Sequence, residues 1–284
     1  MAMETHAINA LGRGGFHRIA YTEWGARDNP RVLLCVHGLT RSGRDFDFLA
    51  AALEADYRVV CPDMAGRGAS GWLADSRGYG YQQYCADMAA LIARLGASEV
   101  DWLGTSMGGI VGMLMAAMPG TPVRRLILND VGPFIPKAAL ARIAGYVTEE
   151  PAFDSLEAAE ARFRTVMASF GPLTDAEWRH FAIHGTTERD GKWHLHYDPG
   201  IGDPFRAGTF EDVDMWATWD AISCPVLVIR GADSDLLLAE TAREMTTRGP
   251  GGELVELDGI GHAPALMAAD QIALVRGWLA RTEG

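Results

Sequence analysis

Short apolar runs alternate with longer helical patterns along most of the chain, and this alternation constrains the fold more than any other feature. Several of the runs contain almost no polar residue, which is typical of strands covered on both faces in a parallel sheet. The alternation predicts an α/β fold, with a mostly parallel sheet and helices on both of its faces. The expected strands are residues 32–36, 57–61, 100–103, 126–128, 226–229 and 254–257, with an antiparallel edge strand at 16–24. The expected helices are residues 46–53, 81–95, 107–118, 239–247 and 270–281.

The alternation is interrupted between residues 128 and 226, where no convincing core strand is visible. Helical spacing recurs there instead, and Thr174-x-x-Glu177 is a capping box that predicts the start of a helix. We therefore expect residues 134–215 to form a mainly helical lid. The lid is inserted into a core that we expect to consist of residues 1–133 and 216–284.

The composition is that of a folded globular protein and excludes several kinds of partner. Hydrophobic residues make up 48% of the 284 residues, which excludes a predominantly disordered chain. The 25 Lys and Arg stand against 37 Asp and Glu, a net charge of −12, so no nucleic-acid or anionic-membrane surface is expected. No signal peptide and no apolar run long enough for a bilayer are visible. The four cysteines form no C-x-x-C pair, which predicts reduced thiols and a cytoplasmic protein, and no feature indicates an oligomeric state.

One pentapeptide carries the strongest chemical signal. Gly104-Thr-Ser-Met-Gly108 matches G-x-S-x-G, with an apolar strand before it and an apolar helix after it. A serine in such a sharp strand-to-helix turn has strained backbone angles, and small flanking residues let the turn close. The turn holds the hydroxyl at a helix N-terminus, where amide dipoles favour an oxyanion. Ser106 is therefore the predicted nucleophile.

A serine hydroxyl needs a base, and the base needs a carboxylate that orients it. His262 is the expected base, because its Gly-rich loop follows the last strand and so lies at the same edge of the sheet as Ser106. Asp235 is the expected acid, since it follows the penultimate strand. Asp233 in the same loop and Asp130, directly after an earlier strand, remain as alternatives.

An oxyanion hole needs two N–H donors directed at the developing charge. We expect one donor from Met107, directly after the nucleophile. The other is expected from Leu39, in the loop His37-Gly-Leu-Thr40 after the first parallel strand, where Gly38 allows the backbone to approach closely. His37 itself is expected to be structural.

These motifs together resemble those of the α/β-hydrolases of the lidded, esterase-like group. The resemblance rests on His37-Gly38, Asp63-Met-Ala-Gly-Arg-Gly-Ala-Ser70, Gly104-Thr-Ser-Met-Gly108, Arg230-Gly-Ala-Asp-Ser-Asp235 and Gly261-His262. It implies an eight-stranded sheet with the lid inserted after the sixth strand. It also excludes the related dehalogenases and epoxide hydrolases, which use an aspartate where Ser106 stands. One position departs from the family pattern, because Ser234 occupies the usual place of the acid, and a slip of one residue makes Asp235 the match.

Three further residues are candidates for contact with the substrate. Trp178 and Phe181 could line an apolar acyl pocket or form the core of the lid itself. Arg41 could hold a substrate carboxylate, although an exposed loop arginine would also fit its position.

No metal site is expected. His180 and His184 stand at i, i+4 on a helix, but they lack the glutamate of an H-E-x-x-H motif. The nearby His194-Leu-His196 fits a strand with its apolar residues on one face.

Together these residues predict a serine hydrolase that cleaves a small carboxylic ester, lactone or thioester through an acyl-enzyme, without a cofactor. Two other classes stay open. A C–C bond hydrolase of aromatic ring-cleavage products shares this fold and triad, and a hydrolase-like protein could bind a small ligand without turnover. Candidates at all three triad positions favour an enzyme with a small-molecule acyl substrate.

Overall fold

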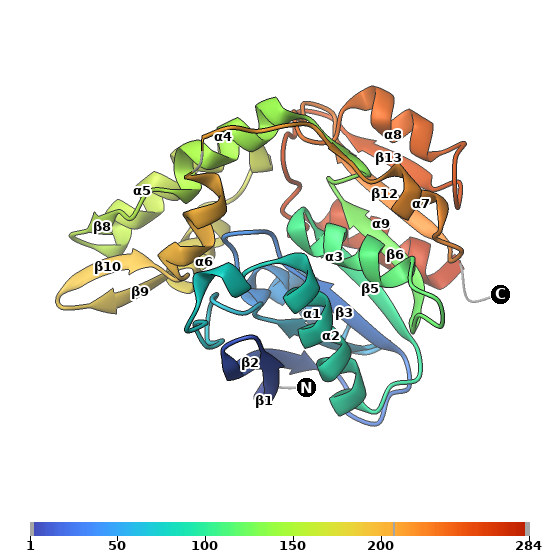
Figure 1. Cartoon of the computed structure of the whole chain (residues 1–284), viewed down its shortest axis with the longest axis horizontal. Helices are drawn as coiled ribbons and strands as arrows, with labels where there is room; N and C mark the ends of the chain where they lie inside the picture. Colours follow the sequence, from blue (N-terminus) through green and yellow to red (C-terminus); the bar gives the residue numbers. More distant parts are fainter. Residues whose placement is uncertain (1–2, 207, 282–284) are drawn as a thin grey trace.

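The computed structural model describes residues 3–206 and 208–281 and contains one large sheet (Figure 1). Its strands are β1 (Glu4–Gly12), β2 (Gly15–Trp24), β3 (Val32–Val36), β4 (Arg58–Pro62), β5 (Val100–Thr105), β6 (Val123–Asn129), β12 (Val226–Gly231) and β13 (Glu253–Leu257). They lie in the order β1-β2-β4-β3-β5-β6-β12-β13. The strands from β4 to β13 are parallel, whereas β1 and β2 form an antiparallel hairpin at one edge. The predicted α/β architecture with an eight-stranded, mostly parallel sheet is confirmed.

Helices cover both faces of the sheet, because successive side chains of each strand point to opposite faces. Leu33 and Cys35 share one buried cluster with residues of α1 (Asp47–Leu53) and α9 (Ala269–Arg281), including Trp278. Leu34 and Val36 face the other layer. That layer consists of α2 (Tyr81–Leu95), α3 (Met107–Ala116), α7 (Trp216–Asp220) and α8 (Ala239–Met245).

Between β6 and α7 the chain leaves the core, and we call residues 134–215 the inserted segment. It contains the helices α4 (Lys137–Val147), α5 (Leu156–Val166) and α6 (Asp175–Gly185), with the 3-10 turns η3 (Ala168–Phe170) and η4 (Pro199–Phe205). Its strands β8 (Ala152–Phe153), β10 (Lys192–Leu195) and β9 (Thr186–Arg189) form a small sheet in that order. The pair β7 (Phe134–Ile135) and β11 (Val213–Asp214) joins its two ends.

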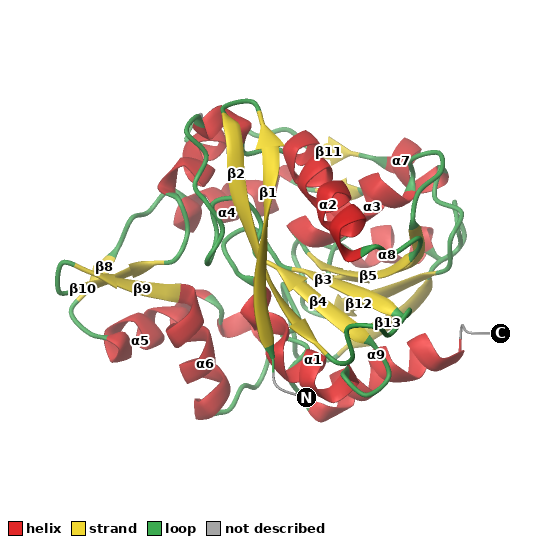
Figure 2. Ribbon diagram, turned by 90° about the horizontal axis from the view of Figure 1, so that it is seen from below, coloured by secondary structure: helices red, strands yellow, loops and turns green. Residues whose placement is uncertain are grey.

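The inserted segment extends to one side of the sheet, and α5 and α6 pack together within it (Figure 2). The predicted capping box is present at the start of α6, where Thr174 and Glu177 cap each other's backbone N–H. On the core side, the turn η1 (Gly43–Phe46) runs directly into α1 and contacts α6. Among the residues that the structure describes, no helix is both long and apolar enough to cross a membrane.

Candidate active site

Ser106 lies in a sharp turn between β5 and α3, as the G-x-S-x-G motif predicts. Its backbone has φ 51° and ψ −115°, a combination that non-glycine residues rarely adopt. The positions of the two flanking glycines leave no room for a side chain. A Cβ on Gly108 would lie 2.0 Å from the carbonyl oxygen of Val36, and one on Gly104 would lie 2.3 Å from the backbone of Gly108. The close contact of β3, β5 and α3 thus fixes the serine at the carboxyl edge of the sheet.

His262 and Ser106 meet at this edge, as the sequence predicts. The Nε2 atom of His262 lies 3.0 Å from Oγ of Ser106. Contacts from both the core and the inserted segment hold the loop that carries His262. Asn129 at the end of β6 donates from Nδ2 to the carbonyl of Pro264 (2.8 Å), and Ser169 in η3 donates to the carbonyl of His262 (3.0 Å). The inserted segment therefore helps to position the histidine.

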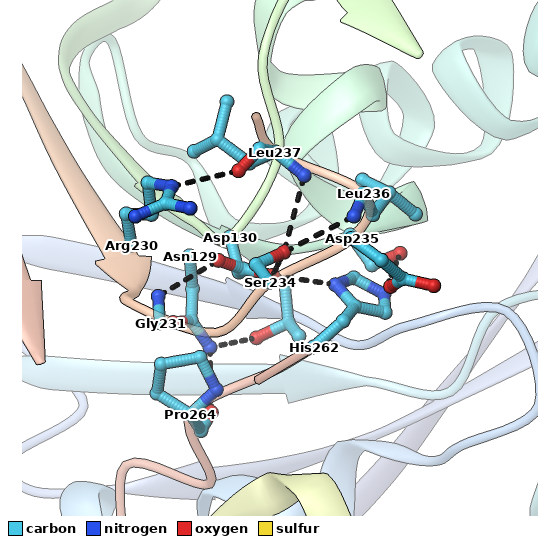
Figure 3. A network of polar contacts seen from close by, with 12 residues as sticks. Asn129, Asp130, Arg230, Gly231, Ser234, Asp235, Leu236, Leu237, His262 and Pro264 are labelled. Atoms are coloured by element: carbon cyan, nitrogen blue, oxygen red, sulfur yellow. Dashed lines mark hydrogen bonds and ion pairs between the residues drawn. The ribbon is translucent and has the colours of Figure 1, made fainter. Parts of the chain in front are cut away.

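The carboxylate that contacts His262 belongs to Asp130, and the prediction that Asp235 occupies this place is wrong. The Nδ1 atom of His262 lies 2.8 Å from Oδ2 of Asp130 (Figure 3). Asp235 is half-exposed and forms an ion pair with Arg142 instead, at 2.8 Å from Nη2 to Oδ1. Asp233, the second choice, is exposed. The third alternative, Asp130, is the one that the geometry supports.

Asp130 is held rigidly in a fully buried position. Its own N–H donates to the carbonyl of Ile229 in β12, which pins the residue at the end of β6. Its carboxylate accepts a hydrogen bond from the N–H of Gly231 (2.9 Å) and another from the hydroxyl of Ser234 (2.6 Å), as Figure 3 shows. These donors hold the carboxylate in the orientation in which it meets Nδ1 of His262.

Ser234 is a candidate site residue that sequence reasoning did not single out. It stands where the family pattern usually has its acid, and its hydroxyl donates to the carboxylate of Asp130 (2.6 Å). The sequence did contain a signal for Asp130, because a serine at position 234 leaves room for a carboxylate that comes from the end of the neighbouring strand. Asp130 follows directly after such a strand.

The proposed oxyanion donors lie on either side of Ser106. Met107 is the first residue of α3, where backbone N–H groups have no partner within the helix. Leu39 lines the cavity in front of Ser106, and a Cβ built on Gly38 would be 3.8 Å from the Cβ of Ser106. The loop that carries Leu39 therefore approaches the nucleophile closely.

Arg67 links both of these residues, and the sequence motif alone did not single it out. Its fully buried guanidinium donates from Nε to the carbonyl of Leu39 (2.8 Å) and from Nη2 to Sδ of Met107 (3.6 Å). It also donates to the hydroxyl of Tyr84 (2.8 Å). Arg67 thus fixes the loop that carries Leu39 against the first residue of α3.

His37 has a structural role, as expected. Its Nδ1 donates to the carbonyl of Gly38 (2.6 Å), and its Nε2 accepts from the N–H of Met64 (2.9 Å). Complete burial lowers the pKa of His37 to about 3, so the ring is neutral and joins the two loops as a donor and an acceptor.

A cavity with about 1100 Å³ of empty space, part of it open to solvent, lies in front of Ser106 and His262. Most of its apolar wall comes from the inserted segment: Ile143, Tyr146, Phe163, Val166, Met167, Phe170, Phe181, Leu195 and Tyr197. The half-exposed charged side chains of Arg142, Glu149 and Arg162 also line it. A neutral acyl group would thus meet mainly apolar side chains, and two further charged side chains of the lining, Arg41 and Asp45, neutralise each other.

The three candidate substrate contacts have different surroundings. Phe181 and Arg41 line the cavity, but Arg41 is 7% exposed rather than an exposed loop residue. Its guanidinium is bonded by two hydrogen bonds to Asp45 and lies over the rings of Phe163 and Phe181. Trp178 does not line the cavity and packs within the core of the inserted segment.

Known proteins similar to this chain point to one family. Residues 33–274 match the model of the alpha/beta hydrolase family. A 3-hydroxybutyrate-oligomer hydrolase from Cupriavidus necator is 50% identical over 279 residues, which cover 94% of each chain. Among solved structures, a hydrolase from Rickettsia typhi superposes with a TM-score of 0.93 over 100% of both chains, at 32% identity. An alpha/beta hydrolase from Novosphingobium aromaticivorans superposes with a TM-score of 0.88 at 37% identity, over 99% of this chain and 100% of the other. This chain therefore belongs to the alpha/beta hydrolase family of enzymes.

Proposed function

We propose that the protein is a serine hydrolase that cleaves esters of short hydroxy acids, with Ser106 as nucleophile, His262 as base and Asp130 as acid. The observation that carries this proposal is the continuous series of hydrogen bonds from Asp130 through His262 to Ser106. A serine, a histidine and a buried carboxylate in this order are the groups that acyl transfer requires.

The first half of the reaction forms an acyl-enzyme. Oγ of Ser106 attacks the ester carbonyl while Nε2 of His262 takes its proton. The N–H groups of Leu39 and Met107 donate hydrogen bonds to the carbonyl oxygen as it becomes negatively charged, and the buried Arg67 holds both residues in place. His262 then donates the proton to the departing alcohol.

The second half releases the acid. Water attacks the acyl-enzyme as His262 removes its proton, and Ser106 leaves with the proton returned from His262. Asp130 keeps the Nδ1–H tautomer of His262 in place and stabilises the imidazolium ion that forms in both halves. The reaction uses only these side chains, the backbone and water.

The substrate class rests on two supports. The relative that is 50% identical is named for the hydrolysis of 3-hydroxybutyrate oligomers, which are short linear esters with apolar methyl branches. The cavity has an apolar wall beside the nucleophile and charged groups near solvent, which suits an oligomer with a terminal carboxylate. We also propose that the inserted segment acts as a lid, because it supplies most of that wall. The four unpaired cysteines fit a cytoplasmic protein.

The test compares kcat/KM of the wild-type protein for a 3-hydroxybutyrate dimer, p-nitrophenyl butyrate and a ring-cleavage dienoate. We expect the two esters to be hydrolysed readily. Ser106→Ala should lower ester turnover by several orders of magnitude, about 10⁵-fold or more, and should abolish labelling by a fluorophosphonate. A kcat/KM about 100-fold higher for the dienoate corresponds to roughly 2.7 kcal/mol of transition-state binding. It would contradict the proposed ester hydrolase and support a C–C hydrolase. A protein that neither turns over esters nor reacts with the fluorophosphonate would be a binding protein.

A further inference from the structure

A second cluster of ionisable side chains lies outside the proposed active site, where α6 meets the beginning of α1. It consists of Asp47, His180 and His184, and one ligand atom of each lies within 4.8 Å of the others. Nε2 of His180 is 3.6 Å from Oδ2 of Asp47. His180 and His184 are one turn apart on α6, with ring centroids 4.4 Å apart. The sequence offers the histidine pair, and the fold adds the carboxylate from the core.

These groups form a suitable ligand set for Zn²⁺. Imidazole nitrogens and carboxylate oxygens bind this ion at about 2.0–2.2 Å, and three protein ligands leave one position for water. Ligand atoms around a tetrahedral ion at that distance lie about 3.4 Å apart. The separation between His180 and Asp47 is close to this value, so small side-chain movements would complete the site.

The ligands of the cluster differ in the contacts that they already make: among the described residues His184 makes no hydrogen bond through its ring, whereas Asp47 and His180 both contact Arg44. The ring of His184 packs edge-on against the ring of His180. Asp47 is paired with the guanidinium of Arg44 (2.8 Å from Nε), and Nε2 of His180 contacts the carbonyl of Arg44 (2.8 Å). A bound ion would replace Arg44 in both contacts, and nearby Arg41 adds further repulsion.

We propose that Asp47, His180 and His184 form a binding site for a divalent transition-metal ion of the Zn²⁺ type, which ties α6 of the inserted segment to the core. Phe181 lies between the two histidines in the sequence and lines the active-site cavity. An ion bound here fixes that wall of the cavity against the core and slows the exchange of substrate and product. The site takes no part in the chemistry of Ser106, so it is independent of the proposed function. It replaces the expectation that the chain has no metal site.

The experiment titrates ZnCl₂ into the metal-free, full-length protein and follows binding by calorimetry. We expect one Zn²⁺ per chain, and a rise in Tm of about 5 °C when free Zn²⁺ reaches about 100 times Kd. His184→Gln should weaken binding by roughly 100-fold, whereas His184→Cys should retain it, because a thiolate is also a zinc ligand. Arg44→Gln should tighten binding, since it removes the cation that competes for Asp47.

Two control variants separate this site from the other histidines. His194→Gln removes an imidazole from β10, and His262→Gln removes the proposed catalytic base; both should bind Zn²⁺ as the wild type does. The proposal is overturned if His184→Gln keeps the wild-type Kd and stoichiometry, if binding is lost only in His262→Gln, or if the wild type binds no Zn²⁺. Unchanged binding in Arg44→Gln would contradict the role given to Asp47.

Discussion

Asp130 and Ser234 meet at one point beside His262, although they follow different strands of the sheet. Asp130 follows β6 and Ser234 follows β12, and these strands are direct neighbours. Replacing Asp130 by Asn keeps the shape of the side chain but favours the wrong tautomer of His262. We expect Asp130→Asn to lower kcat for a butyrate ester by about 10⁴-fold. Asp235→Asn breaks only the ion pair with Arg142 and should change kcat less than tenfold. If steady-state kinetics show a larger loss of kcat in Asp235→Asn than in Asp130→Asn, the role of the acid belongs to Asp235.

Because Ser234 lies beside Asp130, we expect that the proposed acid can be moved from position 130 to position 234. A carboxylate at position 234 would extend from β12 toward the imidazole, in the place that related hydrolases use. We expect the double variant Asp130→Asn/Ser234→Asp to have a kcat at least about tenfold higher than that of Asp130→Asn alone, because the correct tautomer of His262 is favoured again. The matched control is Ser234→Ala in the same background, which should recover nothing. Equal activities of the two double variants would show that position 234 cannot carry the acid.

At the residue level, Ser106 and His262 were predictable, whereas Asp130 was only a third choice. The proposed nucleophile stands in a motif whose two glycines, Gly104 and Gly108, are required by the tight packing around them. The histidine follows the last strand, and its place at the sheet edge does not depend on the length of other loops. The acid can come from either of two adjacent strand ends, and the sequence does not state which side chain reaches the imidazole. Arg67 was missed because nothing local marks a buried arginine that bonds carbonyl groups.

At the scale of elements, Arg41 joins the core to the inserted segment. Asp45 in η1 neutralises its charge, and two aromatic rings of the inserted segment cover its guanidinium. It is therefore a positioning residue rather than a free partner for a substrate carboxylate. We expect Arg41→Gln to lower kcat/KM by a similar factor for p-nitrophenyl butyrate and for the monoanionic p-nitrophenyl succinate. A loss more than about tenfold greater for the succinate, about 1.4 kcal/mol, would make Arg41 a carboxylate ligand instead.

The elements themselves were predicted well where burial is complete and poorly where it is partial. β3 spans the expected residues 32–36, and all five of its residues are buried. β1 was missed, because only one of its nine residues is buried and the hairpin with β2 leaves little alternation to detect. In the inserted segment, β9 and β10 are short and partly exposed, and the third strand of their sheet, β8, lies far away in the sequence.

At the scale of the whole molecule, one buried ion pair connects several layers. Asp101 on β5 and Arg125 on β6 are 1% and 2% exposed, and Nε of Arg125 lies 2.7 Å from Oδ1 of Asp101. Arg125 also donates to the hydroxyl of Tyr57 (3.0 Å) and to the carbonyl of Leu279 in α9 (2.6 Å). The pair thus ties the centre of the sheet to the helix that ends the described chain. Removing Asp101 would take away the carboxylate that balances the charge of Arg125 in the interior.

We expect Asp101→Leu to lower the free energy of unfolding by about 3–5 kcal/mol, measured by urea denaturation. The double variant Asp101→Leu/Arg125→Met should recover most of this loss, because both charges are then absent from the interior. Asp101 lies at the opposite end of β5 from Ser106, roughly 15 Å away at the rise of a strand, so kcat of the folded variants should equal that of the wild type. If the double variant is as unstable as Asp101→Leu alone, the cost does not come from the uncompensated charge of Arg125. If kcat falls with the free energy of unfolding while the protein remains folded, the ion pair and the active site are coupled through β5.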